Sequence, residues 1–98
     1  MIDVDVRCDG NYTDGWSCRV TLRQGGRDIS SHAIRVVAAD LDRLTENAAD
    51  PRAVVEASFD FLLQREAPSS ILRSFDLMDI ARYFPEYETT IRNAARAT

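Results

Sequence analysis

The chain has 98 residues, of which 45% are apolar and 29% are charged, and its formal net charge is −4. This length and composition predict one folded domain, and the apolar runs are too short to span a membrane. The acidic balance argues against binding to a nucleic-acid backbone, because such binding depends on clustered positive charge.

The first third of the chain alternates apolar and polar residues with a period of two, which is typical of β-strands. Residues 2–8 read IDVDVRC and residues 16–23 read WSCRVTLR. Two glycines at 25–26 separate the second run from residues 29–37, as in a two-residue hairpin. We therefore expect residues 1–37 to form a three-stranded antiparallel meander.

Two cysteines, Cys8 and Cys18, fall on the apolar side of the first two runs. The N-terminal residues carry acidic side chains where a signal peptide has a basic segment and then an apolar one, so we expect a cytoplasmic protein. Disulfides are rare in that compartment. Both cysteines are therefore predicted to be reduced residues of the core.

The remainder, residues 39–98, is predicted to be helical. A short helix is expected over residues 38–47. A longer helix begins at Asp50 and Pro51, which suit the N-cap and first helical positions, and ends before Pro68. The polar residues of this longer helix form one narrow stripe: Glu56, Asp60 and Gln64. A helix with so little polar surface is predicted to pack on two sides, between the sheet and the C-terminal segment.

Three further helices are expected near the C-terminus. The first covers residues 71–75, the second covers residues 77–84 with Asp76 as its N-cap, and the last begins at Pro85. The resulting fold class is α+β. One face of the three-stranded meander is covered by the long helix and the shorter C-terminal helices, and the other face is charged and open to water.

Aromatic residues are concentrated around Pro85. Phe84 continues the apolar face of the preceding helix and is predicted to lie in the core. Tyr83 points about 100° away from Phe84, and Tyr87 begins a new helix with a hydroxyl that prefers water or a partner. We expect both tyrosines at an accessible rim, where they would contact a partner.

Four arginines are predicted to share the open face of the sheet: Arg7, Arg19, Arg23 and Arg35. Sheets that bind single-stranded nucleic acid also present aromatic side chains for base stacking, and this face presents none. A surface of salt bridges is the first interpretation, and a site for an acidic protein segment is the second. We expect the chain to bind no nucleic acid and no membrane.

Motifs of catalysis and of cofactor binding are missing from the sequence. The single histidine, His32, lies in a predicted strand, where Cys8 or Cys18 would be its catalytic partner only across the sheet. Residues 9–15, DGNYTDG, are rich in oxygen ligands but lack the glycine and glutamate of a calcium loop. No phosphate-binding loop is present. We therefore assign no catalytic, cofactor-binding or metal-binding residue.

One stretch, EASFDFLLQREAPSSILRSFDLMDIARYFPEY at residues 56–87, resembles a group of small uncharacterised bacterial proteins. The shared pattern is SF-FLL-RE-P-SIL--F-L--I-RYFPE. The resemblance covers about a third of the chain and implies that the C-terminal elements form one structural unit. It implies no activity.

Three functions are compatible with the sequence. The first is a small non-enzymatic protein-interaction or regulatory module, which binds a protein partner or a second copy of itself. The second is a nucleic-acid-linked regulator of the antitoxin type, in which an arginine patch or a dimer outweighs the acidic balance. The third is a small enzyme that uses His32 with a cysteine or a carboxylate. The residues assigned to partner binding are Tyr83, Tyr87, Arg7, Arg19, Arg23 and Arg35.

Overall fold

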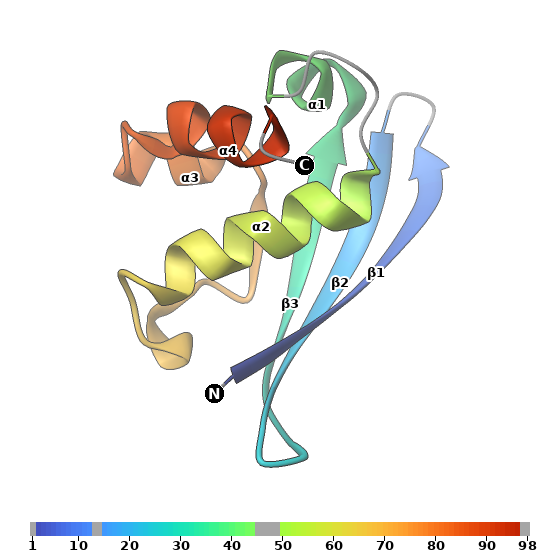
Figure 1. The fold of residues 1–98 in the computed structure, drawn as a ribbon. Coiled ribbons are helices and arrows are strands. Elements are labelled where there is room, and N and C mark those ends of the chain that lie inside the picture. The colour runs from blue at the N-terminus through green and yellow to red at the C-terminus, as the bar shows by residue number, and fades with distance from the viewer. Residues whose placement is uncertain (1, 13–14, 45–49, 97–98) are drawn as a thin grey trace.

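A computed structural model describes residues 2–12, 15–44 and 50–96 of the chain. The predicted α+β class is confirmed, since a four-stranded sheet packs against a set of helices (Figure 1). The strands are β1 (Ile2–Tyr12), β2 (Gly15–Gln24), β3 (Arg27–Val37) and β4 (Ser74–Asp76). The helices are α1 (Ala38–Leu44), α2 (Pro51–Leu63), the short 3₁₀ turn η1 (Pro68–Ser70), α3 (Asp79–Tyr83) and α4 (Tyr87–Arg96).

Strands β1, β2 and β3 form the predicted antiparallel meander. Gly25 and Gly26 connect β2 to β3 with φ angles of 61° and 79°, which glycine adopts without steric cost. The inner face carries the sheet's part of the core, including the fully buried Val20, Leu22 and Val36. Residues 13–14 of the predicted first loop and residues 45–47 of the predicted first helix lie outside the described residues.

The fourth strand replaces the helix predicted at residues 71–75, and that prediction was wrong. Strand β4 runs parallel to β3, with Ile34 opposite Phe75. The chain is held there by two flanking hydrogen bonds, from the Ala33 N–H to the Arg73 carbonyl at 2.7 Å and from the Leu77 N–H to the Arg35 carbonyl at 2.9 Å. Pairing with β3 satisfies backbone groups that a helix of five residues would leave largely unpaired.

Helix α2 is the centre of the fold and begins as predicted. The Asp50 carboxylate accepts a hydrogen bond from the Arg52 backbone N–H at 3.0 Å, and Pro51 occupies the first helical position. The helix contacts β1 and β2 on one side and α4 on the other, while its polar stripe is exposed. Across the described ranges, α2 is the longest helix with 13 residues, and no helix is long and apolar enough to cross a membrane.

The C-terminal helices differ from prediction in their boundaries. Helix α3 has Met78 at its N-cap rather than Asp76, and the Asp79 carboxylate accepts the Asp76 backbone N–H at 3.2 Å. Helix α4 begins at Tyr87, two residues after Pro85. Ion pairs tie this part of the chain to the other helices: Arg65–Glu86 at 3.3 Å and Arg43–Glu88 at 3.2 Å.

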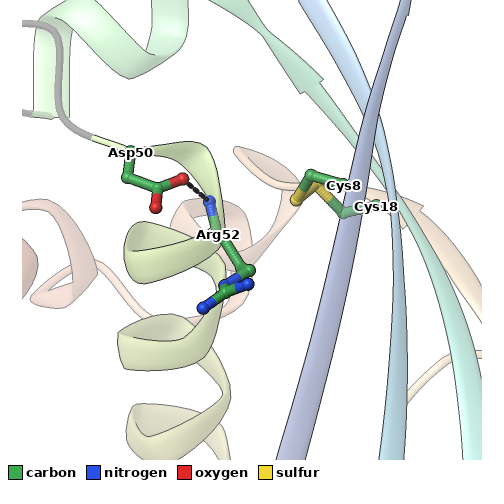
Figure 2. Close-up of a disulfide and its surroundings, with 4 residues drawn as sticks. All are labelled: Cys8, Cys18, Asp50 and Arg52. Atoms are coloured by element: carbon green, nitrogen blue, oxygen red, sulfur yellow. Dashed lines mark hydrogen bonds between the residues drawn. A yellow bond between two sulfur atoms is a disulfide. The ribbon is translucent and has the colours of Figure 1, made fainter.

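The two cysteines are joined, and the prediction that they are reduced was wrong. Cys8 on β1 lies directly opposite Cys18 on β2, and the two residues form a disulfide with a Cα–Cα distance of 4.0 Å (Figure 2). The expected alternation is present, with both sulfurs on the inner face of the sheet. The register of the hairpin decides the outcome, because it places the two cysteines on the same rung of the ladder.

Candidate functional site

A hollow in the surface lies where the end of α2, the segment from η1 to β4, and α3 come together. We call it the C-terminal hollow, and its volume is about 190 Å³. Its walls are mainly apolar and include the buried side chains of Leu62, Ile71 and Ile80. Phe75 and Phe84, which are half-buried, complete the apolar lining.

The apolar lining follows from how the chain leaves α2. Helix α2 ends at Leu63, and Pro68 opens η1, after which the chain runs back beside β3. Phe75 stacks on Phe59 of α2 with a centroid distance of 6.2 Å. Phe84 meets Phe61 edge to face at 5.7 Å. These contacts anchor the Phe75 and Phe84 rings of the lining against α2.

The rim of the C-terminal hollow carries two exposed apolar side chains. Leu72 is 57% exposed and Tyr83 is 70% exposed, and both line the hollow. Ile29, which is 43% exposed, is the third large apolar residue exposed among the described residues, and it lies outside the hollow. Apolar surface gathered around a concave site is typical of interaction sites.

The buried histidine fixes the position of Leu72. The His32 Nδ1–H donates to the Leu72 carbonyl at 2.7 Å, and Nε2 accepts the Ser30 hydroxyl proton at 2.9 Å. The ring, which is 2% exposed, also packs on Phe59 with a centroid distance of 5.4 Å. With its carbonyl held to the sheet, Leu72 directs its side chain to the surface. His32 is therefore a positioning residue of the hollow.

Within residues 2–12, 15–44 and 50–96, the His32 ring has no cysteine or carboxylate partner of the kind that the enzyme alternative requires. Both ring nitrogens are engaged, one by Ser30 and one by the Leu72 carbonyl, and both cysteine sulfurs belong to the disulfide.

Two carboxylates add negative charge to the apolar rim. Glu66 follows the C-terminus of α2, and Asp79 lies in the first turn of α3. Asp79 is partly engaged, since it accepts the Asp76 N–H and lies 3.9 Å from the exposed Arg82 guanidinium. The hollow thus combines an apolar interior with an acidic edge.

The two tyrosines that were predicted at a rim have opposite environments. Tyr83 is exposed, as predicted, and lines the hollow. Tyr87 is fully buried, so its prediction was wrong. Its hydroxyl donates to the Ser58 Oγ at 2.6 Å, and Ser58 donates in turn to the Val54 carbonyl at 2.7 Å. Burial raises the pKa of Tyr87 well above its usual value, because the charged form is poorly solvated there.

The four predicted arginines lie on the open face of the sheet, away from the C-terminal hollow. Arg7 is directly opposite Arg19, and both are exposed. Arg35 is also exposed, opposite Ser17 on β2.

Arg23 is engaged differently, because it forms ion pairs with two carboxylates. It lies 2.7 Å from Asp28 and 3.3 Å from Asp5. The hydrogen bond to Asp28 is the largest of the effects that raise the pKa of Arg23. This arginine is thus part of a salt-bridged surface, which was the first interpretation of the face.

No family model, curated protein or solved structure matches this chain. The resemblance noted for residues 56–87 therefore stays a prediction. The sequence did not point to Leu72, Glu66 or Asp79 as site residues. One signal was available for Leu72, because it is a large apolar residue that falls outside the face shared by Ile71 and Phe75.

Proposed function

We propose that the protein is a small interaction module that binds an apolar side chain of a partner protein in the C-terminal hollow. The observation that carries this proposal is the pairing of an open apolar cavity with two exposed apolar side chains, Leu72 and Tyr83, at its edge. Exposed apolar side chains gathered at the edge of a concave apolar surface are typical of interaction sites.

The size of the hollow suits one side chain. Cavities of about 150 Å³ in protein cores accept a benzene ring. The volume here is about 190 Å³, which is large enough for a leucine or phenylalanine side chain.

The charge at the edge defines the rest of the partner. Glu66 and Asp79 flank the apolar interior, and the whole chain carries a net charge of −4. A basic residue next to the inserted apolar residue would lie near these carboxylates, whereas an acidic residue would be repelled. The partner is therefore an exposed segment in which a leucine or phenylalanine is adjacent to an arginine or lysine.

The expected affinity is modest. Burying one such side chain contributes roughly 1.5–3 kcal/mol. An exposed ion pair adds about 0–1 kcal/mol. These contributions oppose the cost of ordering the partner segment, which indicates transient binding rather than a permanent complex.

The experiment is a titration of isotope-labelled protein with a short peptide that contains Leu-Arg, followed by NMR amide shifts. We expect saturable shifts at Ile71, Leu72 and Ile80, and weaker binding when aspartate replaces the arginine of the peptide. Leu72→Ala and Tyr83→Ala should each weaken binding. The matched control is Ile29→Ala, which removes an exposed apolar side chain elsewhere and should leave binding unchanged.

A second pair of variants tests the charged edge. Glu66→Lys should weaken binding of the basic peptide, while Glu56→Lys, on the exposed stripe of α2, should not. Absence of saturable shifts at the hollow, or equal effects of Leu72→Ala and Ile29→Ala, would refute the proposal.

A further inference from the structure

We propose that the Cys8–Cys18 disulfide is a thiol–disulfide exchange site, at which a protein with two thiols reduces the bond by attacking Cys8. This site is separate from the C-terminal hollow, and it does not depend on the interaction proposed there. Three features of its surroundings support the proposal: the accessibility of one of the two cysteines, an arginine beside it, and strand pairing that extends on both sides of the bond.

The two sulfurs differ in their access to solvent. Cys8 is half-buried and lines an open groove together with Gly10 and Trp16. Cys18 is 1% exposed and does not line the groove. An incoming thiolate therefore reaches Cys8 and not Cys18, which gives the exchange a defined direction of attack.

Positive charge lies along the same groove. Figure 2 shows the disulfide beside the first turn of α2, where Pro51 and Arg52 also line the groove. The partial positive charge of the helix N-terminus and the guanidinium of Arg52 favour an approaching thiolate. Asp50 is the one acidic residue of the lining, and its carboxylate accepts the Arg52 backbone N–H.

Strand pairing between β1 and β2 extends on both sides of the disulfide. The ladder between β1 and β2 runs from Ile2 opposite Gln24 to Asp9 opposite Ser17, on both sides of the bond. The two cysteines are ten residues apart in a hairpin that this ladder already closes.

The exchange balances as two successive displacements. A thiolate of the partner attacks the Cys8 Sγ, so that a mixed disulfide forms, the Cys8–Cys18 bond breaks, and the electron pair leaves on the Cys18 Sγ, which takes a proton from water. The second thiol of the partner loses its proton to water, and the resulting thiolate attacks the partner sulfur that is bonded to Cys8 in the mixed disulfide. Cys8 then leaves as a thiolate and is protonated. Two electrons pass from the partner dithiol to the cysteine pair, and the partner becomes a disulfide.

The test uses the native, full chain in glutathione buffers that range from reducing to oxidising, with thiol content measured by alkylation and mass. We expect the bond to open and re-form reversibly while the circular dichroism spectrum stays that of the folded protein. Trp16 is the single tryptophan and lines the same groove, so its fluorescence should rise on reduction. A bond that resists reduction until denaturant unfolds the chain would overturn the proposal.

Single variants test the direction of attack and the role of charge. Cys18→Ser should form a mixed disulfide with oxidised glutathione roughly tenfold faster, or more, than Cys8→Ser does. Similar rates in the two variants would contradict attack at Cys8. Arg52→Ala should slow reduction of the wild-type disulfide, whereas Arg27→Ala, exposed near the β2–β3 turn, should not. Equal rates in the two arginine variants would overturn the role assigned to Arg52.

Discussion

Truncation of Tyr87 is expected to be among the most damaging single changes to this fold. The side chain is fully buried, and its ring meets Phe61 of α2 edge to face with a centroid distance of 5.4 Å. Deleting a buried aromatic ring typically costs roughly 3–5 kcal/mol, so Tyr87→Ala should lower the free energy of unfolding by about that amount. Tyr83→Ala, at a position that is 70% exposed, should change it by less than about 0.5 kcal/mol.

The hydroxyl of Tyr87 contributes a smaller and separable part. Ser58 donates its own proton to the Val54 carbonyl, so it keeps that hydrogen bond when the tyrosine hydroxyl is removed. Tyr87→Phe should therefore cost only about 0.5–1.5 kcal/mol. If the two side chains are coupled, as their 2.6 Å distance indicates, the double variant with Ser58→Ala should cost less than the sum of the two single changes.

Urea denaturation of these variants decides the question. In a domain of this size, 1 kcal/mol also corresponds to a shift of about 4–8 °C in the melting temperature. Equal losses of unfolding free energy for Tyr83→Ala and Tyr87→Ala would refute the reasoning, because Tyr87 would then contribute no more to the core than the exposed Tyr83 does. A loss for Tyr87→Ala no greater than that for Tyr87→Phe would likewise show that the ring is not packed as described.

Three further outcomes follow from buried groups and the crosslink. His32→Ala should lower the free energy of unfolding by roughly 2–4 kcal/mol, because it deletes a buried ring and its two hydrogen bonds. The same variant should raise the hydrogen-exchange rate around Leu72, and unchanged exchange there would contradict the positioning role of His32. The free energy of unfolding should fall by up to about 1.4 kcal/mol per pH unit as the pH rises above about 10, because a tyrosine in the unfolded chain loses its proton there while burial keeps Tyr87 protonated. Denaturation should show a shallower decline in Tyr87→Phe, and the same slope in both proteins would exclude this cause. Joint replacement of Cys8 and Cys18 by alanine should lower the free energy of unfolding by about 2–3 kcal/mol, which is the loop-closure effect of a link between residues ten apart. The circular dichroism spectrum should stay that of the folded protein, and its loss would show that the sheet depends on the bond.

The strand meander and the central helix were predictable because their signals are local. The alternation of apolar and polar residues fixes which side chains of a strand face inward. The start of α2 is marked by the Asp50 side chain, which caps the helix, and by Pro51, whose missing N–H has no partner to lose at the first helical position. The class of the fold follows from these elements, since a sheet with one apolar face needs a layer of helix to cover it.

Strand β4 was not predictable from the same kind of pattern. Ile71 and Phe75 are four residues apart, a spacing that places two side chains on one face of a helix and also on one face of a strand. The choice between helix and strand is made by hydrogen bonds to β3, forty or more residues earlier in the chain. The C-terminal hollow depends on that choice, because the return of the chain beside β3 is what exposes Leu72 at its rim.

Two other errors have the same physical origin. The hydroxyl of Tyr87 is satisfied by Ser58, a partner 29 residues away on another helix, and periodicity along one helix carries no information about it. The disulfide depends on the register of the first hairpin, and the register shift between Asp9 and Tyr12 follows no simple turn signal. In both cases the deciding contact comes from another element of the fold, and a pattern along one segment does not identify that partner.

The most direct test of the proposed interaction is a search for intermolecular nuclear Overhauser effects between the leucine methyl groups of a bound Leu-Arg peptide and the protein. Our account predicts contacts to Ile80, Phe75 and Phe84, which line the C-terminal hollow. Contacts to Ile29 or to the open face around Arg19, in place of the hollow, would contradict it.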